Sequence, residues 1–236
     1  MDPLLVPRRR RGREVLDDLT VDARIVTRSL ADVARANTLF GGARAVLAEL
    51  DAVLRTHGPR PLTVLDVGTG IGDIPARARA WARARGVHLT TVGLDGSEAL
   101  ARAACSAEHP VVRADALAIP VRDRSVDVVL CSQLLHHFDD DTGVRLLREL
   151  DRVARLRVIV SDLRRSWLAA AGIWVASFPL GFHPVSRHDG VVSVLRGFTR
   201  HELERLVRAA TGCTAETRHR IGFRATAAWT PAAAVA

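Results

Sequence analysis

Apolar residues recur along the chain with two spacings that alternate. From Val21 to Gly58 they recur at the spacing of a helix, with a break at Gly41 and Gly42. From Leu62 onward, short apolar runs alternate with helical segments. The runs predict strands at 62–67, 88–94, 111–112, 126–130 and 156–161, with helices at 74–85, 97–107 and 141–153. Continuous apolar strands joined by helices are typical of a parallel sheet covered on both faces.

The alternation ends after Asp162. A helix-like apolar segment at 167–180 precedes a loop at 181–190 that is rich in His, Pro and Gly, and a helix follows at 199–210. Two strands at 213–218 and 221–229 are expected to form a closing hairpin around residues 219–220. The apolar segment has 14 residues, short of the roughly 20 that span a bilayer, so no stable membrane insertion is expected.

Composition changes this picture little. The chain has 236 residues and a net charge of +8, from 34 basic and 26 acidic residues, and every basic one is arginine. Apart from Arg8–Arg11 with Arg13, the arginines are spread between acidic residues, so we interpret the charge as a composition bias and not as a nucleic-acid site. The cysteines are odd in number and form no CxxC pair, which predicts no disulfide framework and no metal site and favours a reducing cytoplasm; they are Cys105, Cys131 and Cys213.

The strongest local signal follows the first expected strand. Three glycines are spaced GxGxG in the segment Asp66-Val67-Gly68-Thr69-Gly70-Ile71-Gly72-Asp73, which opens the next helix. Glycines allow a tight turn and let a ligand lie against backbone N–H groups and the helix N-terminus. Dinucleotide enzymes use GxGxxG instead, and a chain without Lys or Tyr has no Tyr-x-x-x-Lys pair for nicotinamide chemistry.

Acidic residues follow the next two strands. Asp95, at the tip of the second strand, is suited to accept hydrogen bonds from ribose hydroxyls, although an acid there also serves to cap a helix. Asp115 ends the third strand, where an adenine amine could donate to it. The fourth strand runs into Cys131-Ser132-Gln133-Leu134-Leu135-His136-His137-Phe138. Ligands of open parallel sheets lie beyond the carboxyl ends of the strands, where all these residues fall.

In this order, the motifs between Thr63 and Asp162 resemble those of class I S-adenosylmethionine-dependent methyltransferases. GTGxGD with LHHF resembles the small-molecule group related to ubiquinone and menaquinone biosynthesis. The resemblance implies a Rossmann-like α/β fold with a seven-stranded, mostly parallel sheet, a C-terminal antiparallel hairpin and extra N-terminal helices. Residues 1–58 would be an N-terminal arm and helical cap, and 59–236 the S-adenosylmethionine-binding domain with a lid-like insertion at about 164–195.

The resemblance also assigns cofactor roles to matching positions. The turn would hold the methionine end of S-adenosylmethionine, and its residues are Asp66, Gly68, Thr69, Gly70 and Gly72. Asp73 matches the family pattern too, but an acid at a helix start also stabilises the helix dipole. The other implied positions are Asp95 and Gly96 at the ribose, Asp115 and Ala116 at the adenine, and Ser132 and Gln133 on the methionyl side.

Histidines are the candidate bases, because neutral imidazole accepts a proton near pH 7. His137 and His136 follow the fourth strand beside the expected methyl group, and His188 lies in the lid with Asp189 to orient it. The lid would offer the acceptor an apolar wall with a polar point, formed by Trp167, Trp174, Phe178, Phe182 and His183. Arg28, Asn37 and Phe40 would close over the cofactor.

These features predict O-methylation of a hydrophobic, aromatic or polyketide-like small molecule, with a His general base. C-methylation of a quinol-type acceptor and a catalytically silent protein of this fold stay open as alternatives. A nucleic-acid methyltransferase is disfavoured, since such enzymes often carry Asn/Asp-Pro-Pro-Tyr/Phe where this chain has Cys131-Ser132-Gln133-Leu134. A monomer and a homodimer are both compatible with the sequence.

Overall fold

A seven-stranded sheet forms the centre of the computed structural model, which describes residues 6–10, 12–18, 20–106 and 108–232. The parallel strands are β1 (Leu62–Val67), β2 (Leu89–Asp95), β3 (Val111–Arg113), β4 (Val126–Ser132) and β5 (Ala154–Leu163). The antiparallel strands are β6 (Glu216–Arg220) and β7 (Arg224–Trp229). The strand order is β3-β2-β1-β4-β5-β7-β6. Strands β2 and β3 are added outward on one side from β1, and β5 on the other side from β4, and ligands of such sheets usually bind at the point between β1 and β4. The fold class expected from the sequence is confirmed.

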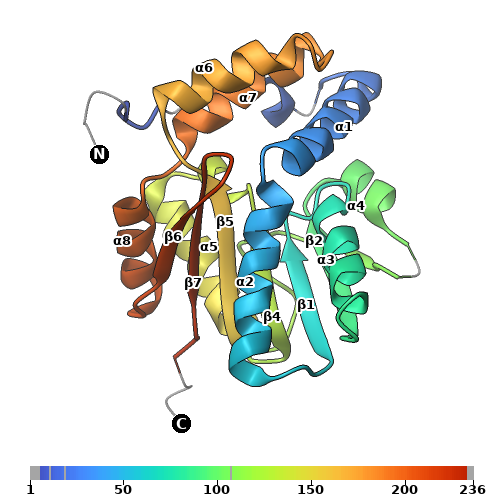
Figure 1. Ribbon diagram of the computed structural model, residues 1–236, viewed down its shortest axis with the longest axis vertical. Coiled ribbons are helices and arrows are strands. Elements are labelled where there is room, and N and C mark those ends of the chain that lie inside the picture. The colour runs from blue at the N-terminus through green and yellow to red at the C-terminus, as the bar shows by residue number, and fades with distance from the viewer. Residues whose placement is uncertain (1–5, 11, 19, 107, 233–236) are drawn as a thin grey trace.

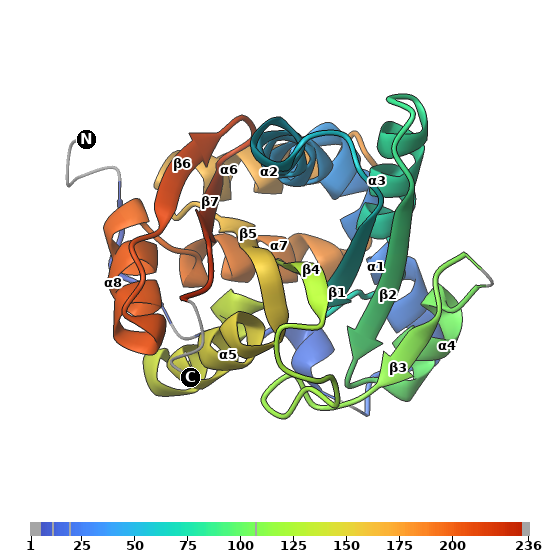
Figure 2. The same cartoon turned by 90° about the horizontal axis from the view of Figure 1, so that it is seen from below.

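Helices cover both faces of this sheet (Figure 2). On one face, α2 (Gly42–His57) and α3 (Asp73–Arg83) pack against β1 and β4. On the other, α5 (Asp140–Val153) and α8 (Arg200–Thr211) bury an apolar stripe against β4, β5 and β7. The stripe of α5 has helical spacing and is fully buried, at Leu146, Leu147, Leu150 and Val153. The short α4 (Glu98–Ala104) lies beside β2 and β3.

A third group of helices lies beyond the carboxyl ends of the parallel strands (Figure 1). It consists of α1 (Ala23–Leu39), α6 (Trp167–Ser177) and α7 (Pro184–Arg196), with the single turns η2 (Val15–Asp17) and η3 (Leu135–His137). Asp32 joins α1 to α7, since its Oδ2 accepts from the His183 N–H at 2.8 Å and the Ser186 hydroxyl at 2.9 Å. These helices thus cover the edge of the sheet where ligands are expected.

Two local predictions were wrong. Residues 184–190 are not loop: Pro184 is the first residue of α7, where its missing N–H costs nothing, and His183 caps the helix. The hairpin turns at 221–223 and not at 219–220, because Gly222 has φ +80° and a Cβ there would lie 1.8 Å from the Phe40 carbonyl oxygen. Ala107, the last residue of the helix expected at 97–107, and Arg11, in the arginine cluster near the N-terminus, lie outside the described residues.

The division at residue 58 and the lid at 164–195 stay predictions, although α6 and α7 fall in the latter range. Within the described ranges, no helix combines the length and the apolar character needed to cross a bilayer.

Glu49 ties α2 to the C-terminal hairpin. Its side chain is 1% exposed and accepts from Thr226 Oγ1 at 2.6 Å, Arg220 Nη2 at 2.6 Å and Arg218 Nη1 at 3.2 Å. Three donors around one buried carboxylate leave unsatisfied groups behind when it is removed.

We therefore expect Glu49→Ala to lower the free energy of unfolding by about 2–4 kcal/mol in denaturant titrations. The control is Glu98→Ala, which removes an exposed carboxylate paired with Arg102 and Arg113 and should cost less than about 1 kcal/mol. Equal losses in the two variants would contradict a structural role for Glu49.

Candidate functional site

The glycine turn after β1 adopts left-handed backbone conformations that its sequence permits. Gly68, Gly70 and Gly72 have φ values of +75°, +57° and +75°. The Gly68 and Thr69 amides both donate to the Leu94 carbonyl, at 2.8 and 3.1 Å, so the turn is fastened to β2. A Cβ on Gly68 would meet Leu134 at 2.9 Å, whereas one on Gly70 would meet nothing within 4 Å. Only Gly70 therefore leaves open space beside its backbone.

Asp66 lies beneath this turn in a buried polar group. Its Oδ2 accepts from the Thr69 hydroxyl at 2.8 Å, and that hydroxyl also lies 3.1 Å from Nε2 of His109. The other oxygen, Oδ1, is buried and has no partner among the described residues. Burial, with the nearby charges of Asp73 and Asp95, raises the pKa of Asp66 to about 7. No sequence motif pointed to His109.

Asp95 joins the first turn to the second. Its Oδ2 accepts from the Gly70 N–H at 3.0 Å and its Oδ1 from the Ser97 N–H at 2.9 Å, just before α4. Burial raises the pKa of this carboxyl. Each carboxylate oxygen has a second lone pair, so these bonds leave capacity for ribose hydroxyls. The capping and the ligand interpretations of Asp95 are therefore compatible.

The remaining cofactor candidates lie along the same edge. The Ala114 N–H donates to the Asp95 carbonyl at 3.1 Å, which brings the end of β3 beside that of β2. Asp115 is exposed and accepts from the Leu117 N–H at 2.9 Å, and Ala116 is half-buried. Next to Asp95, a Cβ on Gly96 would meet only the Ala114 carbonyl, at 3.8 Å.

Gln133 connects the end of β4 to three other segments. It has φ +56°, rare for a residue with a side chain, and its N–H donates to the Ser161 carbonyl at 2.8 Å. Its side-chain amide donates to Asn37 of α1 and accepts from Arg224 Nη1 at 2.6 Å. Asn37 in turn donates to Asp73 at 3.2 Å. Beside Gln133, the buried Ser132 hydroxyl has no partner among the described residues.

This edge fits a nucleoside-type cofactor such as S-adenosylmethionine. Two buried polar atoms, Asp66 Oδ1 and Ser132 Oγ, have no described partner, and the space beside Gly70 is open. Buried polar atoms are normally hydrogen-bonded, so orphaned ones at a sheet edge indicate a ligand position.

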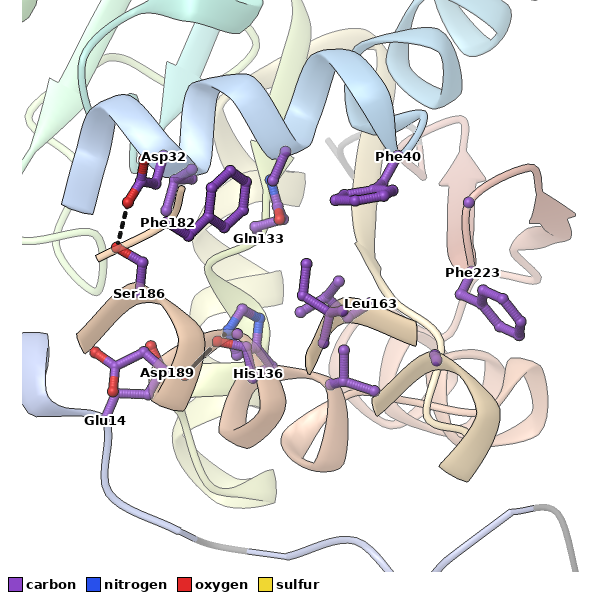
Figure 3. A pocket seen from close by; sticks show the side chains of 18 of the residues that line it. Glu14, Asp32, Phe40, Gln133, His136, Leu163, Phe182, Ser186, Asp189 and Phe223 are labelled. Carbon is purple, nitrogen blue, oxygen red and sulfur yellow. Dashed lines mark hydrogen bonds and ion pairs between the residues drawn. The ribbon is translucent and has the colours of Figure 1, made fainter. Parts of the chain in front are cut away.

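A cavity of about 370 Å³ lies next to this edge and is lined by residues of α1, α6 and α7. It reaches Gln133 at one side, and its apolar wall includes Phe40, Leu163, Ile173, Phe182 and Phe223. In Figure 3, Glu14, Asp32 and Asp189 lie toward one side of the cavity, and Phe40 and Phe223 toward the other. The cavity is thus apolar over much of its wall, with its carboxylates grouped at one end.

The two consecutive histidines stand at the carboxylate end. His136 is buried, with Nδ1 2.7 Å from Asp162 Oδ1 and Nε2 3.6 Å from Glu14 Oε1. Burial lowers the pKa of His136, but Asp162 and Glu14 outweigh it and raise the pKa to about 9. His137 is less buried, with Nδ1 2.9 Å from Asp17 Oδ1 and Nε2 3.9 Å from Glu14 Oε2. Glu14, in a segment without periodicity, was not a sequence candidate.

Ligand atoms of Glu14, His136 and His137 lie within 4.8 Å of one another, within reach of a shared metal ion. Arg196 supplies positive charge at the same place: its Nη1 is 3.2 Å from Glu14 Oε1 and 2.8 Å from Asp17 Oδ2. Since Arg196 and protonated His136 already balance these carboxylates, we interpret the group as an ion-paired cluster. The expectation of no metal site stays a prediction.

The lid residues are divided between the cavity and the surface. Phe182 is buried and lines the cavity. Trp167, Trp174 and Phe178 are 42–52% exposed and are not part of the cavity wall. His183 accepts from the Val185 N–H at 3.3 Å as the cap of α7. His188 is exposed, with Nδ1 2.8 Å from Asp189, so the structure does not bring this third base candidate to the site.

That the N-terminal residues Phe40 and Asn37 close over the cofactor stays a prediction, although both lie near the site. Phe40 lines the cavity and Asn37 holds Gln133. Arg28 lies farther out, where Nη2 donates to the Gly181 carbonyl at 3.1 Å and so links α1 to the segment before α7.

Comparison with known proteins agrees with this geometry. Residues 65–160 match a family model described as a methyltransferase domain. A protein of Mycobacterium sp. (strain JLS), named an uncharacterized methyltransferase, is 33% identical over 154 residues, which are 65% of this chain and 53% of that protein. The chain thus spans about half the length of that relative.

Solved structures share the fold. A SAM-dependent methyltransferase from Aquifex aeolicus has a TM-score of 0.53 at 17% identity, covering 77% of this chain and 89% of that one. The magnesium protoporphyrin IX methyltransferase of Synechocystis PCC 6803 with bound SAH has a TM-score of 0.54 at 17% identity, covering 91% and 90%. Together with the strand order, these solved structures show that the chain has the Rossmann-like α/β fold found in S-adenosylmethionine-dependent methyltransferases, and residues 65–160 within it are similar to a methyltransferase domain.

Proposed function

We propose that the chain transfers the methyl group of S-adenosylmethionine to an oxygen of a hydrophobic, aromatic or polyketide-like small molecule, as in the ubiquinone-related group. The observation that carries this proposal is the position of the cavity. It is largely apolar, it is about 370 Å³ in volume, and its wall includes Gln133, the residue that directly follows β4. An acceptor in this cavity therefore lies next to the site that fits the cofactor.

The cofactor supplies a methyl group on a positively charged sulfur. The chain's own residues would bind and orient it: the turn of Gly68, Thr69 and Gly70 at the methionine end, and Asp95 at the ribose. Ser132 and Gln133 would face the methionyl side, and Asp115 with Ala116 the adenine. With both reactants held in place and water excluded by α1, α6 and α7, alignment of the acceptor oxygen supplies much of the rate enhancement.

The acceptor hydroxyl must lose a proton as its oxygen becomes the nucleophile. His136 is held as a cation between Asp162 and Glu14, so it is not a free base at neutral pH. His137 lies at the same end of the cavity with a longer Nε2–Glu14 separation of 3.9 Å. His137 is therefore our candidate base, and His136 its electrostatic neighbour.

The first test compares two glycines. Gly70 and Gly86 both have positive φ, +57° and +69°, and a Cβ at either would meet nothing within 4 Å. Gly70→Ala and Gly86→Ala should therefore each cost about 1 kcal/mol of stability. Calorimetry should show S-adenosylmethionine affinity lost in Gly70→Ala and in Asp95→Ala, and unchanged in Gly86→Ala. Normal affinity in both site variants would refute the cofactor assignment.

The second test uses the pH dependence of stability. Burial raises the pKa of Asp66 to about 7 in the folded state, whereas an aspartate of the unfolded chain titrates near 4, so the folded protein keeps a proton that the unfolded chain has already lost. The free energy of unfolding should therefore fall between about pH 5 and pH 8, by about 2.5 kcal/mol. Asp66→Asn should lack this loss in denaturant titrations across that range. The control is Asp127→Asn. Burial raises the pKa of Asp127, but hydrogen bonds from Thr63 and Arg155 outweigh burial and lower it, so Asp127 is ionised over this whole range. Asp127→Asn should therefore change the free energy of unfolding by the same amount at every pH and leave its pH dependence in place. Parallel curves for wild type and Asp66→Asn would contradict the raised pKa.

The third test addresses the base. With an acceptor found in a panel of alkylphenols, hydroxybenzoates and quinols by transfer of labelled methyl, His137→Ala should lower kcat by about 10²–10³-fold and leave the affinity for S-adenosylmethionine intact. The control is His201→Ala, since His201 is also a histidine beside a carboxylate, Glu204, but is exposed on α8. An unchanged kcat in His137→Ala would exclude this base, and a wild type that binds cofactor but methylates nothing in the panel would count against the acceptor class.

A further inference from the structure

Arg224 is a buried cation in the wall of the acceptor cavity. It begins β7, directly after the turn in which Gly222 packs against Phe40, and its side chain is 3% exposed. Apart from Gln133, its neighbours in the cavity wall are apolar, with Phe223 beside it in sequence and Phe40 and Leu163 near the same turn. A guanidinium in such surroundings is costly unless a negative charge meets it.

The hydrogen bonds of Arg224 supply no such charge. Its Nη1 donates to the neutral amide oxygen of Gln133 at 2.6 Å, and its Nε has no partner among the described residues. The nearest acid in the sheet, Asp162, already accepts from His136 Nδ1 at 2.7 Å and from the Leu163 N–H at 2.7 Å. Burial lowers the pKa of Arg224 to about 10, and Asp162 offsets this only in part.

The other buried arginines of the described chain are paired. Arg165 Nη2 lies 2.8 Å from Glu202, and Arg196 Nη1 lies 2.8 Å from Asp17. Arg224 makes no ion pair with any described residue, although it is at least as buried as these two. The one buried arginine that lacks a carboxylate is thus also the one that lines the cavity.

We propose that Arg224 binds an anionic group, a carboxylate, on the methyl acceptor, so that the acceptor class is a hydrophobic hydroxy acid. The planar guanidinium matches a carboxylate in shape, and a charge-assisted bond in an apolar cavity is strong. The carboxylates of the cavity wall, Glu14, Asp32 and Asp189, already accept from other groups, and the cation His136 is paired with Asp162 and Glu14, so Arg224 is the cation of the described wall that is left for an anion. An anionic acceptor would therefore be oriented with its acid at Arg224. This inference rests on the proposed function, because it concerns the acceptor of the same site.

The test uses a matched pair of probes, 2-hydroxy-6-pentylbenzoate and 3-pentylphenol, which differ by the carboxylate. Binding of each is measured by calorimetry to the full chain in the presence of S-adenosylhomocysteine. Wild type should bind the carboxylate probe about tenfold or more tightly than the phenol. Arg224→Gln should abolish this preference and Arg224→Lys should restore part of it, while the affinity for the phenol changes little in both.

Arg164→Gln is the control variant. Arg164 carries the same charge 4.7 Å from the Phe223 ring but does not line the cavity, so its removal should leave the preference intact. Because Arg224→Gln removes a buried charge without a carboxylate partner, its thermal midpoint should stay close to that of wild type, which keeps the comparison valid. Equal binding of both probes by wild type, or a preference that survives in Arg224→Gln, would overturn the proposal.

A further experiment tests whether Arg224 binds the carboxylate of the cofactor and not that of the acceptor. S-adenosylhomocysteine and 5′-methylthioadenosine, which lacks the amino-acid part, are compared on wild type and Arg224→Gln. The ratio of the affinity for S-adenosylhomocysteine to the affinity for 5′-methylthioadenosine is expected to be the same in wild type and in Arg224→Gln. If Arg224→Gln lost affinity for S-adenosylhomocysteine but not for 5′-methylthioadenosine, Arg224 would be assigned to the cofactor and the proposal would be overturned. If wild type bound neither nucleoside, the proposed function itself would fail, an outcome separate from either result for Arg224.

Discussion

The buried contact between Asp162 and His136 holds together the edge of the sheet on which the whole site depends. Asp162 is fully buried at the end of β5 and accepts from both the ring and the N–H of His136, at 2.7 and 3.1 Å. This fixes the turn after β4 against β5. Through His136, the contact reaches Glu14 in the N-terminal arm, and through Glu14 it reaches Arg196 of α7. One ion pair thereby links the sheet to the segments that enclose the cavity.

The glycine turn, the proposed cofactor half of the site, could be predicted as a structure from the sequence because it is encoded locally. A strand, a glycine turn and a helix follow one another within a few residues, and the left-handed backbone of Gly68, Gly70 and Gly72 follows from the residue type. The position of Asp95 at a strand end could likewise be predicted from the sequence, because this residue ends an apolar strand. The role of His109 could not be predicted in this way. It contacts Thr69 and Thr91 only in the assembled sheet, and the residues next to it in the sequence form no motif.

The cavity, the proposed acceptor half, depends on contacts between distant parts of the chain, and sequence patterns describe these poorly. The first half of α7 contains Pro, His and Gly, a composition that predicts a loop at 181–190. Gly190 nevertheless suits a helix pair, because a Cβ there would approach Ile173 of α6 to 3.2 Å. Helix α6 is apolar on all sides, so its sequence does not say which face is buried. Trp174 of α6 and Phe178, which follows the helix, face outward, where the guanidinium carbon of Arg187 lies 5.8 and 3.7 Å from their ring centres.

The contact between Gly222 and Phe40 also bears on how the protein folds. The cavity wall takes residues from the arm at Glu14, from the end of α1 at Phe40 and from the hairpin at Gly222 and Arg224. The glycine turn, in contrast, needs mainly β1, α3 and β2, which are close in sequence. Contacts between distant segments form late, since a long loop must close before they can contribute. A nascent chain emerging from the ribosome can therefore assemble the strand–turn–helix unit early, but the cavity cannot be complete until the hairpin of β6 and β7 has been made.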